Sequence, residues 1–102
     1  MAFWTIIGTG IEGDTTGRTF GVTLNTADDT WTAGGGSVDM FFKSKSGTYK
    51  HVVIPEIGAQ LAHGSTEIAL FRNLIATSPV GATGTGRASE KGVNFKWKLD
   101  SK

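Results

Sequence analysis

Lysines alternate with aromatic residues in two segments of the chain, residues 41–51 and residues 95–98. Lysines that follow a phosphate backbone, next to rings on which bases stack, are typical of proteins that bind single-stranded nucleic acid. Because neighbouring residues of a strand point to opposite faces, we expect the rings of residues 95–98 to lie in the core. The rings left for an exposed face are those of Phe41 and Tyr49. The candidate surface for nucleic acid or another partner therefore comprises Phe41, Lys43, Lys45, Tyr49, Lys50, Lys96 and Lys98.

Acidic residues are concentrated in the first part of the chain. Residues 1–40 hold five acidic residues and one basic residue, whereas residues 41–102 hold four acidic and nine basic residues. Carboxylates beside turns can converge on a calcium ion, but they more often cap their own backbone, and no EF-hand spacing is present. Opposite charges on one chain can steer a contact between copies. The candidate acidic partner surface is Glu12, Asp14, Asp28, Asp29 and Asp39.

Sequence motifs for catalysis or cofactor binding are weak or absent. Residues 8–13 match the dinucleotide pattern G-x-G-x-x-G, but residues 14–18 predict a turn and a strand instead of the required helix. Two histidines are too few for a histidine-rich zinc site. The sequence contains no G-x-S-x-G, S-x-x-K or H-E-x-x-H motif. We therefore predict no catalytic residue, metal or cofactor, although a hydrolytic site assembled from distant residues stays open.

Trp31 is a third candidate for ligand binding. It lies between Thr30 and Thr32 in a stretch rich in turn residues, where its ring could serve as a stacking platform for a glycan or small ligand. The alternative is a tryptophan packed into the core, as most large aromatic side chains are.

Composition predicts a single globular domain over residues 1–102. The chain is 38% hydrophobic, contains 15 glycines and no cysteine, and has a net charge of +1. Such a sequence is too apolar for a disordered segment and lacks any basis for disulfide or thiolate chemistry. The N-terminus does not have the pattern of a signal peptide, and no apolar run is long enough to span a membrane. We expect a cytoplasmic or particle-associated protein.

Two segments alternate apolar and polar residues as half-buried strands do. Their inward residues are predicted to be Phe20, Val22, Leu24, Phe95, Trp97 and Leu99. Further strands are predicted at residues 3–7, 37–43 and 48–54, with a short one at residues 30–32. Glycine-rich residues 81–92 are predicted to form a long loop, which is the best candidate for a mobile segment.

Residues 66–76 have a spacing that fits a short helix. Ser65 is a candidate N-cap, Ile68, Phe71 and Leu74 fall on one stripe, and Pro79 follows. A strand in this region remains the alternative, with poorer alternation. The predicted fold is therefore all-β, a small β-sandwich or partly open barrel of five to six strands with one short helix, and an OB-like barrel is the alternative.

These observations favour a non-enzymatic protein that assembles with itself or with a protein partner, such as a subunit of a viral or phage particle or a similar array. The sequence also leaves open a single-stranded nucleic-acid-binding barrel and a lectin-like ligand-binding module. No membrane partner is expected.

Overall fold

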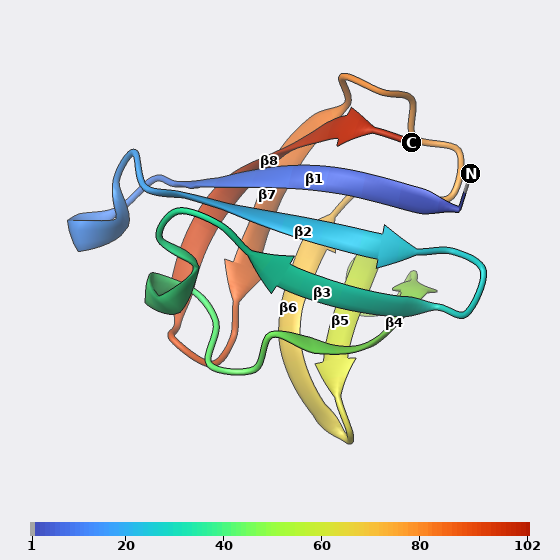
Figure 1. The fold of residues 1–102 in the computed structure, drawn as a ribbon, viewed down its shortest axis with the longest axis horizontal. Helices are drawn as coiled ribbons and strands as arrows, with labels where there is room; N and C mark the ends of the chain where they lie inside the picture. The colour runs from blue at the N-terminus through green and yellow to red at the C-terminus, as the bar shows by residue number, and fades with distance from the viewer. Residues whose placement is uncertain (1) are drawn as a thin grey trace.

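The strands form one closed antiparallel barrel in which each strand pairs with its neighbours in the chain (Figure 1). The computed structural model describes residues 2–102, and within them the last of eight strands pairs with the first to close the barrel. The strands are β1 (Phe3–Gly10), β2 (Thr19–Asn25), β3 (Thr30–Gly34), β4 (Ser46–Val52), β5 (Gly58–His63), β6 (Thr66–Arg72), β7 (Thr83–Ala88) and β8 (Val93–Ser101).

This up-and-down order gives the barrel two different ends. At the terminal end lie both chain ends, the turn of residues 26–29 and the loops of residues 53–57 and 73–82 (Figure 1). At the helical end lie the turns of residues 64–65 and 89–92 and two short 3-10 helices, η1 (Gly13–Thr15) and η2 (Val38–Met40).

The barrel interior is filled by the residues that alternate inward along the strands. The six side chains predicted to be inward from β2 and β8 are all buried, which confirms the two-residue periodicity. Phe41 and Phe42, which directly follow η2, close the helical end, and their ring centroids lie 4.6 and 4.9 Å from that of Phe20. Leu74, from the loop of residues 73–82, is fully buried towards the terminal end.

Glycines on the inner face make room for these large rings. Four inward glycines each face an aromatic residue directly across a strand pair: Gly8 with Phe20, Gly47 with Trp31, Gly84 with Trp97, and Gly86 with Phe95. A Cβ atom on Gly84 would lie 2.7 Å from atoms of the Trp97 indole. Because so small a barrel has little interior volume, bulky rings fit only where the facing wall carries no side chain.

Two tryptophans use their indole N–H groups where the strand ladder is interrupted. The paired positions of β6 and β7 end at Phe71 and Gly86. Just beyond, Trp97 Nε1 donates to the carbonyl oxygens of Arg72 and Thr85, both at 3.1 Å. Trp31 Nε1 donates to the Ala62 carbonyl at 2.9 Å, where the register of β5 and β6 shifts. Both indoles thus satisfy backbone acceptors that the sheet leaves free.

The all-β prediction is confirmed, but the prediction of a β-sandwich or partly open barrel of five to six strands is wrong, because the barrel is closed and has eight strands within residues 2–102. Three strands were not predicted, β5, β6 and β7, and β7 occupies much of the segment predicted to be a mobile loop at residues 81–92. The reason is that Gly84 and Gly86 stand at inward positions of β7, so the strand has no apolar alternation to detect.

The helix predicted at residues 66–76 is also wrong, because residues 66–72 form β6. The irregular register against β5 buries Ile68 and Ala69 consecutively, and this break in alternation mimics helical spacing. Residues 37–43 were predicted to be a strand and instead contain η2. Within residues 2–102 no helix is long and apolar enough to cross a membrane.

Replacing Gly84 by alanine is predicted to destabilise the barrel by about 1–3 kcal/mol, because the added methyl overpacks the indole of Trp97. The indole cannot move aside, since it is buried and its N–H is held by two carbonyls. The matched control is Gly34→Ala, where a Cβ meets no atom within 4 Å. Urea denaturation of both variants measures the effect, and equal stability of the two would contradict the packing role of Gly84.

Candidate functional site

Binding surfaces lie on the outside of this barrel, because aromatic and aliphatic side chains fill its interior. Three hollows that residues 2–102 form on the outer wall are candidate binding sites. The first, of about 430 Å³, lies over β1, β2 and β3, and the second, of about 270 Å³, lies over β4, β5 and β6. The third and largest, of about 680 Å³, lies over β7, β8 and β1.

The lysines predicted to share one surface are spread over three parts of the molecule. Lys96 and Lys98 point outward from β8 and line the largest hollow. Lys43 and Lys45 lie between η2 and β4, at the helical end. Lys50 is on β4, which is four strands away from β8 in either direction around the barrel. The seven predicted residues therefore do not form one surface.

The three rings predicted to be exposed are buried. Phe41 and Trp31 have 0% and 1% of their surface exposed, and Tyr49 has 7%. The expectation of stacking rings at Phe41 and Tyr49 is therefore wrong. For Trp31 the ligand platform is wrong, and the alternative of a tryptophan packed into the core is confirmed. Phe41 is inside because the chain turns in after η2 to close the barrel end, and Trp31 is an inward residue of β3.

Tyr49 also has its hydroxyl in an unfavourable setting for ionisation. Burial raises the pKa of Tyr49, and the carboxylates of Asp29 and Asp28 raise it further.

The acidic residues divide between the two ends of the barrel. Glu12, Asp14 and Asp39 lie at the helical end, and Asp28 and Asp29 lie at the terminal end. Glu12 accepts a hydrogen bond from the backbone N–H of Asn94, and Asp39 forms an ion pair of 2.9 Å with Lys45. Among residues 2–102 no three acidic or histidine side chains come together as metal ligands. The carboxylates are thus used mainly in local contacts.

Glu90, which the sequence analysis did not single out, clamps the segment that closes the helical end. Its Oε1 atom accepts from the backbone N–H groups of Lys43 at 2.9 Å and Ser44 at 3.1 Å. Its Oε2 atom accepts from the Ser44 hydroxyl at 3.3 Å. Partial desolvation acts to raise the pKa of Glu90, but the hydrogen bonds from Ser44 and Lys43 outweigh it and lower that pKa below its ordinary value.

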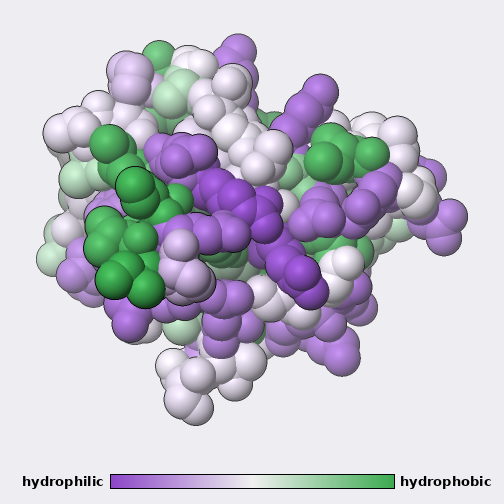
Figure 2. Space-filling model, turned by 180° about the vertical axis from the view of Figure 1, so that it is seen from behind, coloured by the Kyte–Doolittle hydropathy of each residue, from purple (hydrophilic) through white to green (hydrophobic). Residues whose placement is uncertain are grey.

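The terminal end carries an apolar patch that sequence reasoning missed. Six large hydrophobic side chains are exposed there, and Ile54 and Val53 are 82% and 70% exposed. Figure 2 shows apolar side chains gathered at the left, which corresponds to the right of Figure 1, where both chain ends lie. The patch, called the apolar rim below, comprises Phe3, Val53, Ile54, Ile57, Ile75 and Val80.

The signal for the rim was present in the sequence as the run Val52-Val53-Ile54-Pro55, in which apolar residues continue up to a proline. The run was assigned to a strand, but β4 ends at Val52. Its remaining residues therefore lie in a loop, and the other members come from distant segments that only the closed barrel brings to the same end.

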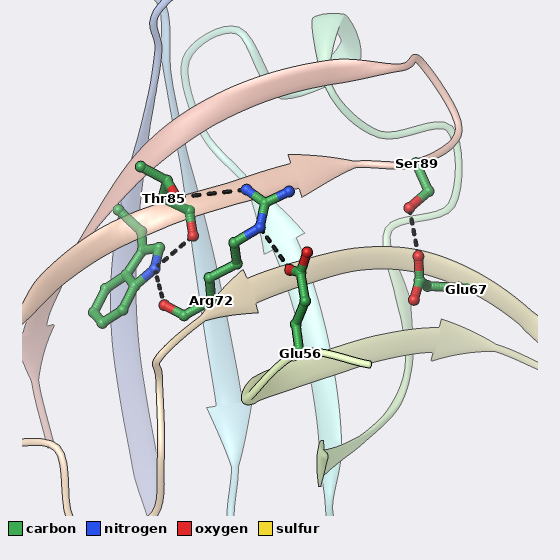
Figure 3. Close-up of polar contacts among 6 residues, drawn as sticks. Glu56, Glu67, Arg72, Thr85 and Ser89 are labelled. Carbon is green, nitrogen blue, oxygen red and sulfur yellow. Dashed lines mark hydrogen bonds and ion pairs between the residues drawn. The ribbon is translucent and has the colours of Figure 1, made fainter. Parts of the chain in front are cut away.

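Charged groups of both signs lie beside the apolar rim. Arg72, at the end of β6, donates from Nε to Glu56 at 2.7 Å, and its Nη1 lies 3.4 Å from the Thr85 hydroxyl (Figure 3). Lys102 Nζ lies 4.5 Å from the centre of the Trp4 ring and donates to the Ser78 carbonyl. Asp28 and Asp29 are exposed in the neighbouring turn.

No family model, curated protein or solved structure matches this chain. The functional proposal therefore depends on the surfaces described above.

Replacing Glu90 by glutamine is predicted to destabilise the protein at neutral pH and to make its stability less sensitive to acid. A carboxylate whose folded pKa is lowered stabilises the fold above its unfolded pKa, and this contribution is lost as the pH falls through the folded pKa. Denaturation at about pH 7 and about pH 3 should thus show a gap between wild type and Glu90→Gln that narrows at the lower pH. A gap independent of pH would show that the charge of Glu90 does not stabilise the clamp.

Proposed function

We propose that this chain is a non-enzymatic, self-associating module whose copies meet through the apolar rim at the terminal end of the barrel. The observation that carries the proposal is the concentration of exposed apolar side chains there: of the seven large hydrophobic residues exposed in residues 2–102, all but Ile11 belong to the rim. Contiguous apolar surface that is rimmed by polar groups is typical of interaction sites.

The closed barrel favours contact through loops over contact through strands. Because β1 pairs with β8, the sheet has no free edge to which a strand of another copy could add. The remaining way to bury apolar surface between copies is to bring side-chain patches together, and the rim is such a patch.

The charges near the apolar rim favour a second copy of the chain as the partner that binds there. The net charge is +1, so two copies have little long-range repulsion to overcome. Both signs of charge flank the rim, with Arg72 and Lys102 on one hand and Glu56, Asp28 and Asp29 on the other. A two-fold contact places the same patch on both partners, so a patch that carries both signs can pair with itself. The homo-oligomer would be the unit from which a larger array or particle is built.

Replacing Val53 by aspartate is predicted to shift the protein from oligomer to monomer. The side chain is exposed in the free chain, so its replacement leaves the fold intact but places a charge in an interface that excludes water. Light scattering coupled to size-exclusion chromatography, over a range of protein concentrations, measures the mass.

The matched control is Ile11→Asp. Ile11 is 46% exposed but lies at the helical end, so this variant should keep the mass of the wild type. A wild-type protein that stays monomeric at high concentration, or an Ile11→Asp variant that dissociates as readily as Val53→Asp, would rule out association through the rim.

A further inference from the structure

The largest of the three hollows lies on the wall of the barrel, where β7, β8 and β1 are side by side. Its volume of about 680 Å³ is within the range of small-molecule sites. The hollow exists because short side chains flank β8: Thr83 and Thr85 point outward on β7, and Thr9 points outward on β1. The long lysine side chains of β8 rise between them.

Lys96 and Lys98 give the hollow a positive charge. They alternate with the buried residues of β8 and so point to the same face, with Cα atoms about 7 Å apart. Both lysines are exposed, and in the part of the chain that the structure describes neither forms an ion pair. Asp100 is the acidic residue of the lining. Two ammonium groups without a carboxylate partner therefore face the same space.

Hydroxyl groups stand next to each ammonium group. In the strand register Lys96 lies between Thr9 on β1 and Thr85 on β7, and Lys98 lies opposite Thr83 on β7. Lysine donates as a point charge, and threonine adds a hydroxyl donor on either side. At the edge of the hollow the guanidinium of Arg72, which is paired with Glu56, approaches the Thr85 hydroxyl.

We propose that this hollow binds a tetrahedral oxyanion, the phosphate or sulfate ester group of a small ligand. Lys96 and Lys98 supply the charge, and Thr9, Thr83 and Thr85 supply hydroxyl donors to the remaining oxygens. Ile7, half-buried between the lysines of β8 and the glycine of β2 that it faces, gives the non-ionic part of the ligand an apolar wall. The lining of this hollow contains none of the residues of the apolar rim, so the proposal is tested separately from self-association.

A small ester fits this hollow better than a nucleic-acid strand. Among the lining residues the aromatic one is Trp97, which is 2% exposed and points into the barrel. Bases of a single strand are held by stacking on exposed rings, and the hollow offers none. Lys50 on β4 lies on the opposite wall of the barrel, too far away to extend the charged track.

The test is a titration followed by amide NMR chemical shifts of the full chain, with inorganic phosphate, pyrophosphate and sulfate as separate probes. We expect saturable shifts confined to the strands that line the hollow, including the amides of Thr9, Thr85 and Lys98. We also expect at least one probe to bind more than tenfold more weakly to the Lys96→Gln/Lys98→Gln variant. Tighter binding of pyrophosphate assigns a phosphate ester, and tighter binding of sulfate assigns a sulfate ester.

The control variant is Lys50→Gln, which removes an exposed lysine from the opposite wall and should leave the affinity unchanged. The proposal is overturned if no probe shifts these amides, or if Lys50→Gln weakens binding as much as the double variant does. It is also overturned if a short oligothymidylate binds far more tightly than every small anion and shifts amides on both walls, because that result identifies a nucleic-acid surface.

Discussion

The packing of large aromatic rings against bare backbone is the constraint on which the rest of this barrel depends. Phe20, Trp31, Phe95 and Trp97 each lie across a strand pair from a glycine. Because the glycines carry no Cβ atom, the rings from the neighbouring strands can fill the interior as densely as protein cores are usually packed. Some of these rings make favourable edge-to-face contacts, such as Phe20 with Phe95, whose centroids lie 5.1 Å apart. The glycines that make the sequence look loop-like are therefore part of the core.

The same rings also hold the barrel closed. Where β6 and β7 stop pairing, the Trp97 indole N–H takes the place of the ladder, and Trp31 does so at the irregular register of β5. Each indole contributes apolar area inside the barrel and a hydrogen bond in its wall. Within the described residues, no buried side-chain donor or acceptor lacks a hydrogen-bond partner. Glu90 likewise accepts hydrogen bonds from the backbone N–H groups of residues 43 and 44, and so holds the segment that follows Phe41 and Phe42 at the helical end.

A filled and closed barrel limits function to its outside. Aromatic and aliphatic side chains fill the interior, and β1 pairs with β8, so the walls and the loops at the ends are the surfaces that partners can reach. The apolar rim and the lysine-lined hollow occupy these two kinds of surface and differ in chemistry: the first is apolar with mixed charge around it, and the second is cationic with hydroxyl groups. The two surfaces are formed by different residues, the rim at the terminal end and the hollow on the wall of β7, β8 and β1.

Alternation of apolar and polar residues was enough to predict an all-β chain and the buried faces of β2 and β8. The reason is that successive side chains of a strand point to opposite faces, so a half-buried strand has an apolar residue at every second position. Strand β7 could not be predicted in this way, since its inward positions are glycines whose role depends on rings from β8. The candidate site residues were the least predictable: Phe41, Tyr49 and Trp31 have the types of binding residues, but the tertiary fold turns them inward. The rim, in turn, combines loops that are distant in sequence. Local periodicity determines which face of a strand is apolar, whereas exposure and proximity are set by how the strands close around one another, and only the tertiary structure contains that information.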